Sequence, residues 1–446
     1  MIAAWLSLSP VVQSGIIAIV GAAIGAIAND AIYRWAYFSD RPISPWMSVN
    51  RFNERLAGDR DGSGANGGQL QPRRLWHRLP IVGWWGLSRE SSVHGRWHWV
   101  RPMLIEVCMA VSLVWYYRYA IVGGGLLPEA ARTADFLIDY RPLAVPMFVA
   151  HGFLAGLLVA ATFIDFDEKT IPDEITVPGT LLGIVMGSIS VHVFPPSAAG
   201  GWLLPTTFDS PWMNANPAVQ PGSVWFGPAG LGLGCGIALL WCFALCDRRW
   251  TMAMVRRRGL FGAWRHFAGI LIRSPQTKLA AALAVVMCVF IAAMFNIGGQ
   301  TWLGCLTSLV GLAIGGGIVW SIRAVASGAM GRMAMGFGDV TLMAMIGSIV
   351  GWQGTLLAFF LAPFTAIVIV VVRYVMTGDK ETPFGPYLAA GTVLTVLAWN
   401  PLFNQRFALQ LQMLGGLIMW MAAFMFVAMA VLLIGWRLLS DRLFRR

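Results

Sequence analysis

Apolar stretches of about 20 residues recur along most of this 446-residue chain. A helix of that length crosses the hydrocarbon core of a bilayer, which is about 30 Å thick. Only 12% of the residues are charged, whereas a soluble domain has about 25%. Because lipid cannot satisfy free backbone amides, the spans must be helices. We therefore expect an all-α fold, a polytopic transmembrane helical bundle.

The apolar stretches predict about 9–11 spans, with a cytoplasmic loop domain, 36–101, after the first span. The Gly351-Trp352-Gln353 stretch is a candidate break among the late spans. The predicted spans are 11–35, 102–122, 142–164, 176–195, 225–246, 279–298, 302–324, 340–358, 359–376, 386–400 and 411–437. The predicted domains are 1–141, a membrane core 142–400 with an inserted segment around 196–324, and 401–446, a last span with a basic tail.

The distribution of charge predicts how the chain is oriented. The net charge is +11, and the arginines lie in loops between apolar spans, which favours a topological role over binding of nucleic acid. Segment 36–101 carries ten arginines, and 247–278 carries eight Lys and Arg against one acid. These two segments and the C-terminal tail should face the cytoplasm. Segments 123–141 and 196–224, which are poor in basic residues, should face outward.

Two polar segments at span entrances contain the candidate catalytic residues. Asp165 lies where one span ends, and Asp339 lies where a later span begins. Four predicted spans separate them, and an even number returns the chain to the same face, so both carboxyls should lie at the cytoplasmic boundary. Acids at helix ends can also simply meet water, and Asp173, just after Pro172, is equally well explained as a helix cap.

Gly336 and Gly338 strengthen the functional interpretation of Asp339. Glycine allows unusual backbone angles and close approach of a substrate backbone. Two facing carboxyls can share one proton, because like charges a few ångströms apart cannot both ionise. The ionised carboxyl then takes a proton from water while the neutral one donates to a scissile carbonyl. Asp165 and Asp339 are therefore the candidate catalytic pair of a hydrolase.

Other chemistries have weaker support in the sequence. The six cysteines include no CxxC pair, and the six histidines are scattered, so we expect no metal site. Neither GxSxG, HExxH nor a P-loop is present. A transporter or channel is the alternative from another class, but it would need acids near mid-membrane, and the predicted spans contain almost none.

Several blocks of sequence resemble the type IV prepilin peptidases, which are GxGD-type membrane aspartic proteases. The two main blocks run from Asp165 to Pro178 and from Ala334 to Asp339. Shorter blocks extend the resemblance: Gly25–Asn29, Leu79–Trp84, Arg101–Glu106, Met343–Gly347, Gly351–Gln353 and Pro383–Ala389. The resemblance touches most of the chain, in separated blocks.

The resemblance implies that Asp165 and Asp339 are catalytic, with Gly336, Gly338, Pro172 and Asp173 as supporting motif residues. It implies a multi-pass protein of the bacterial inner membrane, with the active site facing the cytoplasm. Its partners would be the lipid bilayer and prepilins or pseudopilins, the substrates of type IV pilus and type II secretion systems. The enzyme would cut the short basic leader from the hydrophobic helix that follows. An inactive member of the family is the remaining alternative.

Three departures from the family pattern bear on function. Full-length members often carry two CxxC pairs in the cytoplasmic loop, and here that loop has no cysteine. We therefore expect proteolysis to need no cofactor, and methylation of the new N-terminus with S-adenosylmethionine is in doubt. The stretch between the catalytic blocks is also unusually long. Finally, Thr341 stands where the family usually has a lysine, which changes the charge near Asp339.

Overall fold

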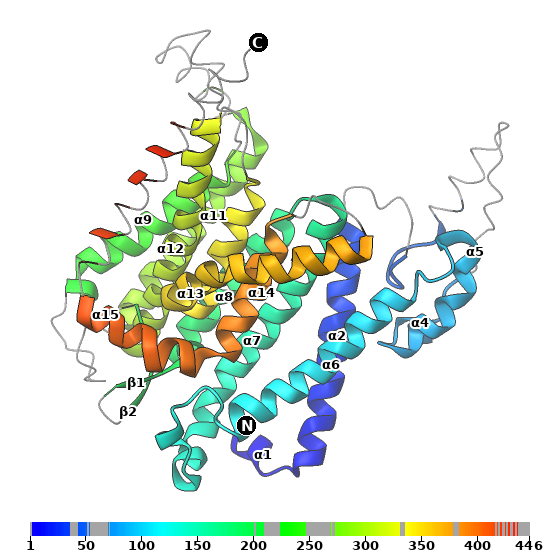
Figure 1. The fold of residues 1–446 in the computed structure, drawn as a ribbon, viewed down its shortest axis with the longest axis horizontal. Coiled ribbons are helices and arrows are strands. Elements are labelled where there is room, and N and C mark those ends of the chain that lie inside the picture. The colour runs from blue at the N-terminus through cyan, green and yellow to red at the C-terminus, as the bar shows by residue number, and fades with distance from the viewer. Residues whose placement is uncertain are drawn as a thin grey trace.

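The computed structural model describes an almost wholly helical chain (Figure 1). The described residues are 2–35, 43–50, 72–199, 202–208, 224–246, 273–330, 335–377 and 383–414, together with single residues outside these ranges. Most of the predicted basic loop 247–278, the glycine-rich part of loop 36–101 and the C-terminal tail lie outside the described residues. The expected all-α polytopic bundle is confirmed by these helices.

The N-terminal part consists of two long helices and a small helical segment on the predicted cytoplasmic side. After α1 (Ile2–Leu6), helix α2 (Pro10–Trp35) packs along α6 (Val100–Tyr117), which continues as a π-helical turn η3 (Arg118–Val122). Figure 1 shows the small segment beyond the N-terminal end of α6, away from the main bundle. Its helices are η1 (Leu75–Arg78), α4 (Val82–Leu87), η2 (Ser88–Glu90) and α5 (Ser91–His94).

Helices α7 and α8 carry the first predicted catalytic block. A short turn η4 (Glu129–Ala131) precedes α7 (Ala134–Glu168), and α8 (Asp173–Ile189) follows α7 after a four-residue connection. A turn η5 (Val191–Val193) then leads into the hairpin of β1 (Pro196–Ala199) and β2 (Trp202–Pro205), paired antiparallel from Pro196↔Pro205 to Ala199↔Trp202. This hairpin falls within the predicted outward segment 196–224.

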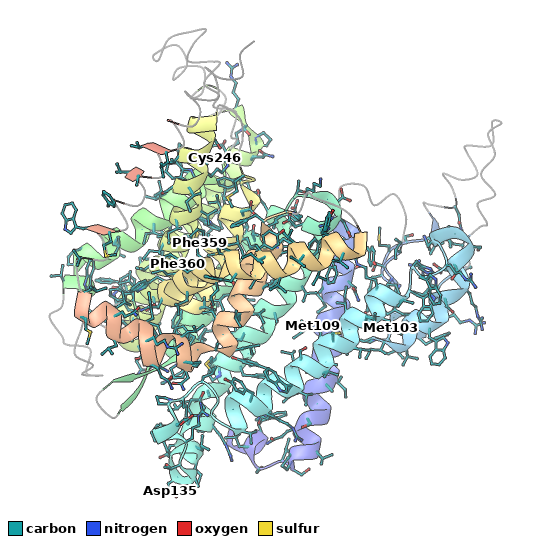
Figure 2. The ribbon with its side chains drawn as sticks, in the orientation of Figure 1. Met103, Met109, Asp135, Cys246, Phe359 and Phe360 are labelled. Carbon is teal, nitrogen blue, oxygen red and sulfur yellow. The ribbon has the colours of Figure 1, made fainter. Side chains whose placement is uncertain are left out.

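In the long stretch between the two catalytic blocks, the described residues include two helices that lie on one side of the bundle. After η6 (Val224–Phe226), these are α9 (Pro228–Ala244) and α11 (Pro275–Ile297), which pack on α12 (Gly299–Met330) around the buried Trp302 and Ile291. Figure 2 shows Asp135 at the start of α7 and Cys246 just after α9 at opposite ends of the molecule. The predicted topology likewise places their two loops on opposite membrane faces.

Helix α13 (Gly338–Thr377) reverses direction at Gly351, where φ is 74° and ψ is 171°. A methyl group added to Gly315 of α12 would touch both Met343 and Thr355. In a straight helix those two residues would be about 18 Å apart. The chain therefore folds back at Gly351, within the candidate break, and the predicted boundary between spans 340–358 and 359–376 is wrong.

The remaining helices complete the bundle. Helix α14 (Gly385–Leu397) packs against α13 and α7, and a π-helical segment η7 (Asn400–Phe407) leads into α15 (Ala408–Leu414). By length and composition, six described helical segments could cross a membrane, the last of which contains the reversal at Gly351: Pro10–Trp35, Val100–Val122, Ala134–Glu168, Pro275–Ile297, Gly299–Ser327 and Gly338–Val375. Two shorter apolar helices are α9 and α14. The total of 9–11 spans and the three domain boundaries stay predictions.

Candidate active site

Asp165 lies in the last turn of α7 and is only 4% exposed. Lys169 ends the helix in the left-handed conformation, with φ 54°, and its backbone N–H donates to the Asp165 carbonyl at 2.9 Å. Such a left-handed residue closes a helix by satisfying a carbonyl of its last turn. The chain then turns sharply toward α8, so the Asp165 side chain lies at an inner corner of the bundle.

Asp339 lies at the opposite wall, in the first turn of α13, and is 8% exposed. The backbone of Gly336 hydrogen-bonds its carboxylate. A methyl group on Gly338 would lie 2.8 Å from Ile171 Cβ, so only glycine allows the start of α13 to approach the Asp165 block this closely. The two glycines thus have different roles: Gly336 binds the carboxylate, and Gly338 permits packing.

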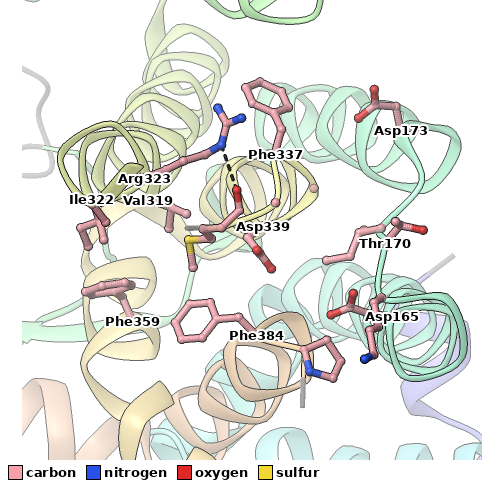
Figure 3. A pocket seen from close by; sticks show the side chains of 17 residues that line it. Asp165, Thr170, Asp173, Val319, Ile322, Arg323, Phe337, Asp339, Phe359 and Phe384 are labelled. Atoms are coloured by element: carbon pink, nitrogen blue, oxygen red, sulfur yellow. Dashed lines mark hydrogen bonds between the residues drawn. The ribbon is translucent and has the colours of Figure 1, made fainter. Parts of the chain in front are cut away.

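The two acids line one cavity of about 750 Å³. Figure 3 shows both carboxyl groups pointing into it. Helices α7, α12 and α13 and the connection before α8 form its walls, and Phe384 lies just before α14. The structure therefore brings Asp165 and Asp339 together, as the count of four intervening spans requires. Which membrane face the cavity meets stays a prediction. The lining side chains include three aromatic rings, Phe337, Phe359 and Phe384.

Gly385 contacts Asp165, which the sequence motifs did not predict. Its backbone N–H donates to Asp165 Oδ2 at 3.1 Å. A methyl group on Gly385 would lie 2.5 Å from that oxygen and 2.8 Å from Ile171 Cδ1. The only sequence signal was the Pro383–Ala389 block in the family resemblance, which assigned Gly385 no function.

The other acids of the first block differ in their surroundings. Asp173 is exposed at the start of α8 and lines the cavity, while Pro172 is the N-cap residue of that helix. Asp167 instead forms a two-point ion pair with Arg101, with N–O distances of 3.1 and 2.8 Å. Pro172 thus shapes the connection, and Asp173 is the further acid of this block at the cavity.

The positive charge near Asp339 comes from α12, and not from position 341 of α13. Thr341, where a lysine is usual in the family, is buried, and its hydroxyl donates to the Gly338 carbonyl at 3.1 Å. Arg323 of α12 lines the cavity and interacts electrostatically with Asp339. No local motif marks Arg323 in the sequence, because it precedes Asp339 by 16 positions.

The described part of the chain offers few side chains that could bind a metal or cofactor. The described residues contain no group of three His, Cys, Asp or Glu side chains placed to hold a metal ion. The two acids between residues 72 and 106 are Glu90 and Glu106. Glu90 forms an ion pair with Arg73, and Glu106 accepts hydrogen bonds from Asn29 and Trp84. Both carboxylates therefore already have partners within the chain.

Comparison with known proteins shows that part of the chain is similar to one family. Residues 275–371 match the model of the type IV leader peptidase family. A prepilin leader peptidase/N-methyltransferase of Aeromonas hydrophila is 32% identical over 109 residues, which are 23% of this chain and 37% of the relative. Proteins of the same name match from Pseudomonas putida (29% identity; 29% and 37% covered) and Stutzerimonas stutzeri (34%; 22% and 39%). No solved structure gives a significant match.

These matches support the family that the sequence blocks resemble. The chain spans less than two fifths of the length of the three curated relatives. The family segment contains Gly336, Gly338 and Asp339, whereas Asp165 lies N-terminal to it. The facing of Asp165 and Asp339 across one cavity therefore rests on the structure and not on the matched segment.

Proposed function

We propose that this chain, being similar to the type IV prepilin peptidases, is a membrane-embedded aspartic endopeptidase that removes the short basic leader of prepilins or pseudopilins. One observation carries the proposal: Asp165 and Asp339, from segments 174 positions apart in sequence, line the same cavity. Both are largely buried, and buried acids in a membrane protein are costly and usually functional.

The two carboxyls would act without a covalent intermediate. One is ionised and takes a proton from the attacking water, and the other is neutral and donates to the carbonyl oxygen of the scissile bond. Gly336 and Gly385 hold Asp339 and Asp165, respectively, through their backbones. Phe359 and Phe384 give the cavity an apolar wall beside the two acids. The geometry fits general acid–base hydrolysis of a peptide backbone that enters beside Gly336.

Cleavage of a co-expressed prepilin tests the proposal. We expect Asp165→Asn and Asp339→Asn each to abolish cleavage, while the variants insert and accumulate as the wild type does. Glu174→Gln is the matched control, since Glu174 is an exposed acid of the same block that does not line the cavity. If wild type leaves every prepilin and pseudopilin uncut, the proposed function fails. If either Asn variant cleaves at the wild-type rate, Asp165 and Asp339 do not act as a catalytic pair.

We propose that the cavity faces the cytoplasm in the bacterial inner membrane. The arginines of 36–101 and the basic residues of 247–278 support this orientation. A leader that stays in the cytoplasm would then meet the two acids where its hydrophobic helix enters the membrane. We expect single cysteines placed in 123–141 to be labelled from outside the cell. Single cysteines placed in 72–99 should be labelled only after the membrane is permeabilised. The reverse pattern would refute the orientation.

Methylation has less support than proteolysis. The curated relatives are named as N-methyltransferases, but Glu90 and Glu106 here are already bound by the chain's own donors. We propose that processed pilin leaves this enzyme with a free N-terminal amine. Mass spectrometry of mature pilin decides: an added methyl group that depends on this protein would refute the proposal.

A transporter or channel is not favoured. Among the described residues, the buried acids are Glu106, Asp165 and Asp339. Glu106 is fully used by hydrogen bonds in the N-terminal part, and the other two lie in one cavity. Among the described residues, these acids therefore form no series of carboxylates across the bundle, which is the feature that the transporter alternative would need.

A further inference from the structure

Arg323 lies near the end of α12 and reaches the loop that leads into Asp339. Its Nε donates to the carbonyl oxygen of Met335 at 3.0 Å (dashed line in Figure 3). Its Cζ lies 5.5 Å from the centroid of the Phe337 ring, within range of a cation–π contact. One side chain therefore contacts the residues on both sides of Gly336.

The loop 335–338 needs such support because two of its four residues have no side chain. Gly336 supplies the backbone hydrogen bond to the Asp339 carboxylate, and its own backbone position is not fixed by packing of a side chain. Arg323 holds Met335 and Phe337 from a long, well-packed helix. A shift of Arg323 would therefore move the group that binds Asp339.

Arg323 also lines the same cavity as Asp339 and interacts with it electrostatically. Position 341, on the same helix as Asp339, holds a buried threonine that bonds within its own turn. The guanidinium of Arg323 therefore supplies a positive charge, a hydrogen-bond donor for the Met335 carbonyl and a planar surface for the Phe337 ring.

We propose that Arg323 is a positioning residue for the peptidase reaction: it fixes the 335–338 loop so that Asp339 faces Asp165 across the cavity. The inference rests on the proposed function, because the reaction it serves is cleavage by this pair. A displacement of about 1 Å in such a pair can lower the rate on the order of 100-fold.

Two substitutions and a matched control test the role. Arg323→Gln removes the charge and the cation–π contact, and we expect kcat to fall roughly 10- to 100-fold with KM within about twofold of wild type. Arg323→Lys keeps a cation and a donor for the Met335 carbonyl but loses the planar guanidinium, so it should recover part of that loss. Arg406→Gln removes an exposed arginine of η7 outside the cavity and should cleave as wild type does.

Hydrogen exchange gives a readout that is independent of cleavage. In Arg323→Gln, the amides of 335–342 should exchange about tenfold faster, while those of α14 stay as in wild type. Unchanged exchange in 335–342 would overturn the inference even where wild type cleaves prepilin. A change in KM without a change in kcat for Arg323→Gln would also overturn the inference. The same holds if Arg323→Lys cleaves no faster than Arg323→Gln. Failure of wild type to cleave any prepilin would instead refute the proposed function.

Discussion

The backbone N–H of Gly385 donates to Asp165 Oδ2 at 3.1 Å, joining residues 220 positions apart. Gly385 is the first residue of α14, so this contact fixes the start of one helix to the carboxyl at the end of another, α7. The bond also orients the carboxylate, because the oxygen that accepts from Gly385 is held against the α14 terminus. The loop before α14 therefore belongs to the candidate active site.

We expect Gly385→Ala to lower cleavage by roughly 100-fold, because the added methyl group would displace Asp165. That methyl would lie 2.5 Å from Asp165 Oδ2, inside contact distance. Gly236→Ala in α9 is the control, since a methyl there meets nothing within 4 Å. Prepilin cleavage is compared at equal amounts of membrane-inserted protein. Full activity of Gly385→Ala would show that the Asp165 carboxyl is not held as the structure has it.

Asp167→Asn should cleave prepilin within about threefold of wild type, although Asp167 is two residues from Asp165. Asp167 pairs with Arg101 and does not line the cavity. Both side chains are 38% exposed, and such pairs contribute about 0–1 kcal/mol. Parallel assays of Asp165→Asn and Asp167→Asn separate the two acids. Equal loss in both would place Asp167 in the reaction.

The helical bundle could be predicted from patterns within single segments, and the shared face of Asp165 and Asp339 from the number of predicted spans between them. Apolar length predicts a helix, and counting helices between two acids predicts whether they share a face. The reversal at Gly351 was harder to place, since the apolar pattern continues through it. A φ of 74° is open to glycine at little cost, so the Gly351-Trp352-Gln353 stretch was the one available signal.

The contacts of Gly385 and Arg323 could not be predicted from sequence. Each depends on how helices pack: α14 against α7 for Gly385, and α12 against the 335–338 loop for Arg323. Helix packing is set by side-chain shape along whole interfaces, which no local motif records. The replacement of a lysine by Thr341 did indicate that the charge beside Asp339 differs here, but not which residue supplies it.

The small segment after α2 should be sensitive to acid through Glu90. Its carboxylate accepts from Arg73 Nε and Nη2 at 3.2 and 2.8 Å, and His94 Nε2 lies 3.4 Å away. Burial opposes ionisation, but the nearby His94 and Arg73 side chains outweigh it and lower the pKa of Glu90 from 4.5 to about 2. A lowered pKa in the folded state means that ionisation favours folding. This stabilisation is complete above about pH 4.5 and is lost as the pH falls toward 2.

Amide protection factors of residues 82–98, corrected for intrinsic exchange, measure this dependence. In wild type they should fall between pH 4.5 and 2. In Glu90→Gln they should be lower at pH 6 and change less over the acid range, because the amide side chain does not ionise. Identical profiles for the two proteins would show that Glu90 does not stabilise the segment.

Glu106 should hold the same segment to the membrane helices without a metal. Its side chain is 1% exposed and accepts hydrogen bonds from Asn29 Nδ2 at 3.0 Å, from Trp84 Nε1 at 2.7 Å and from the backbone N–H of Ile81. These donors come from α2, from α4 and from the residue before α4. A single carboxylate on α6 therefore joins the small segment to α2 and α6.

We expect Glu106→Leu to lower the protection of residues 82–98 by at least tenfold, because each buried donor left without an acceptor costs about 1–3 kcal/mol. Glu129→Gln, at an exposed acid of the 123–141 loop, should change nothing. A zinc chelator should leave both protection and cleavage of the wild type intact. Loss of protection on chelation, restored by zinc, would show that a metal and not the carboxylate of Glu106 links the segment to α2 and α6.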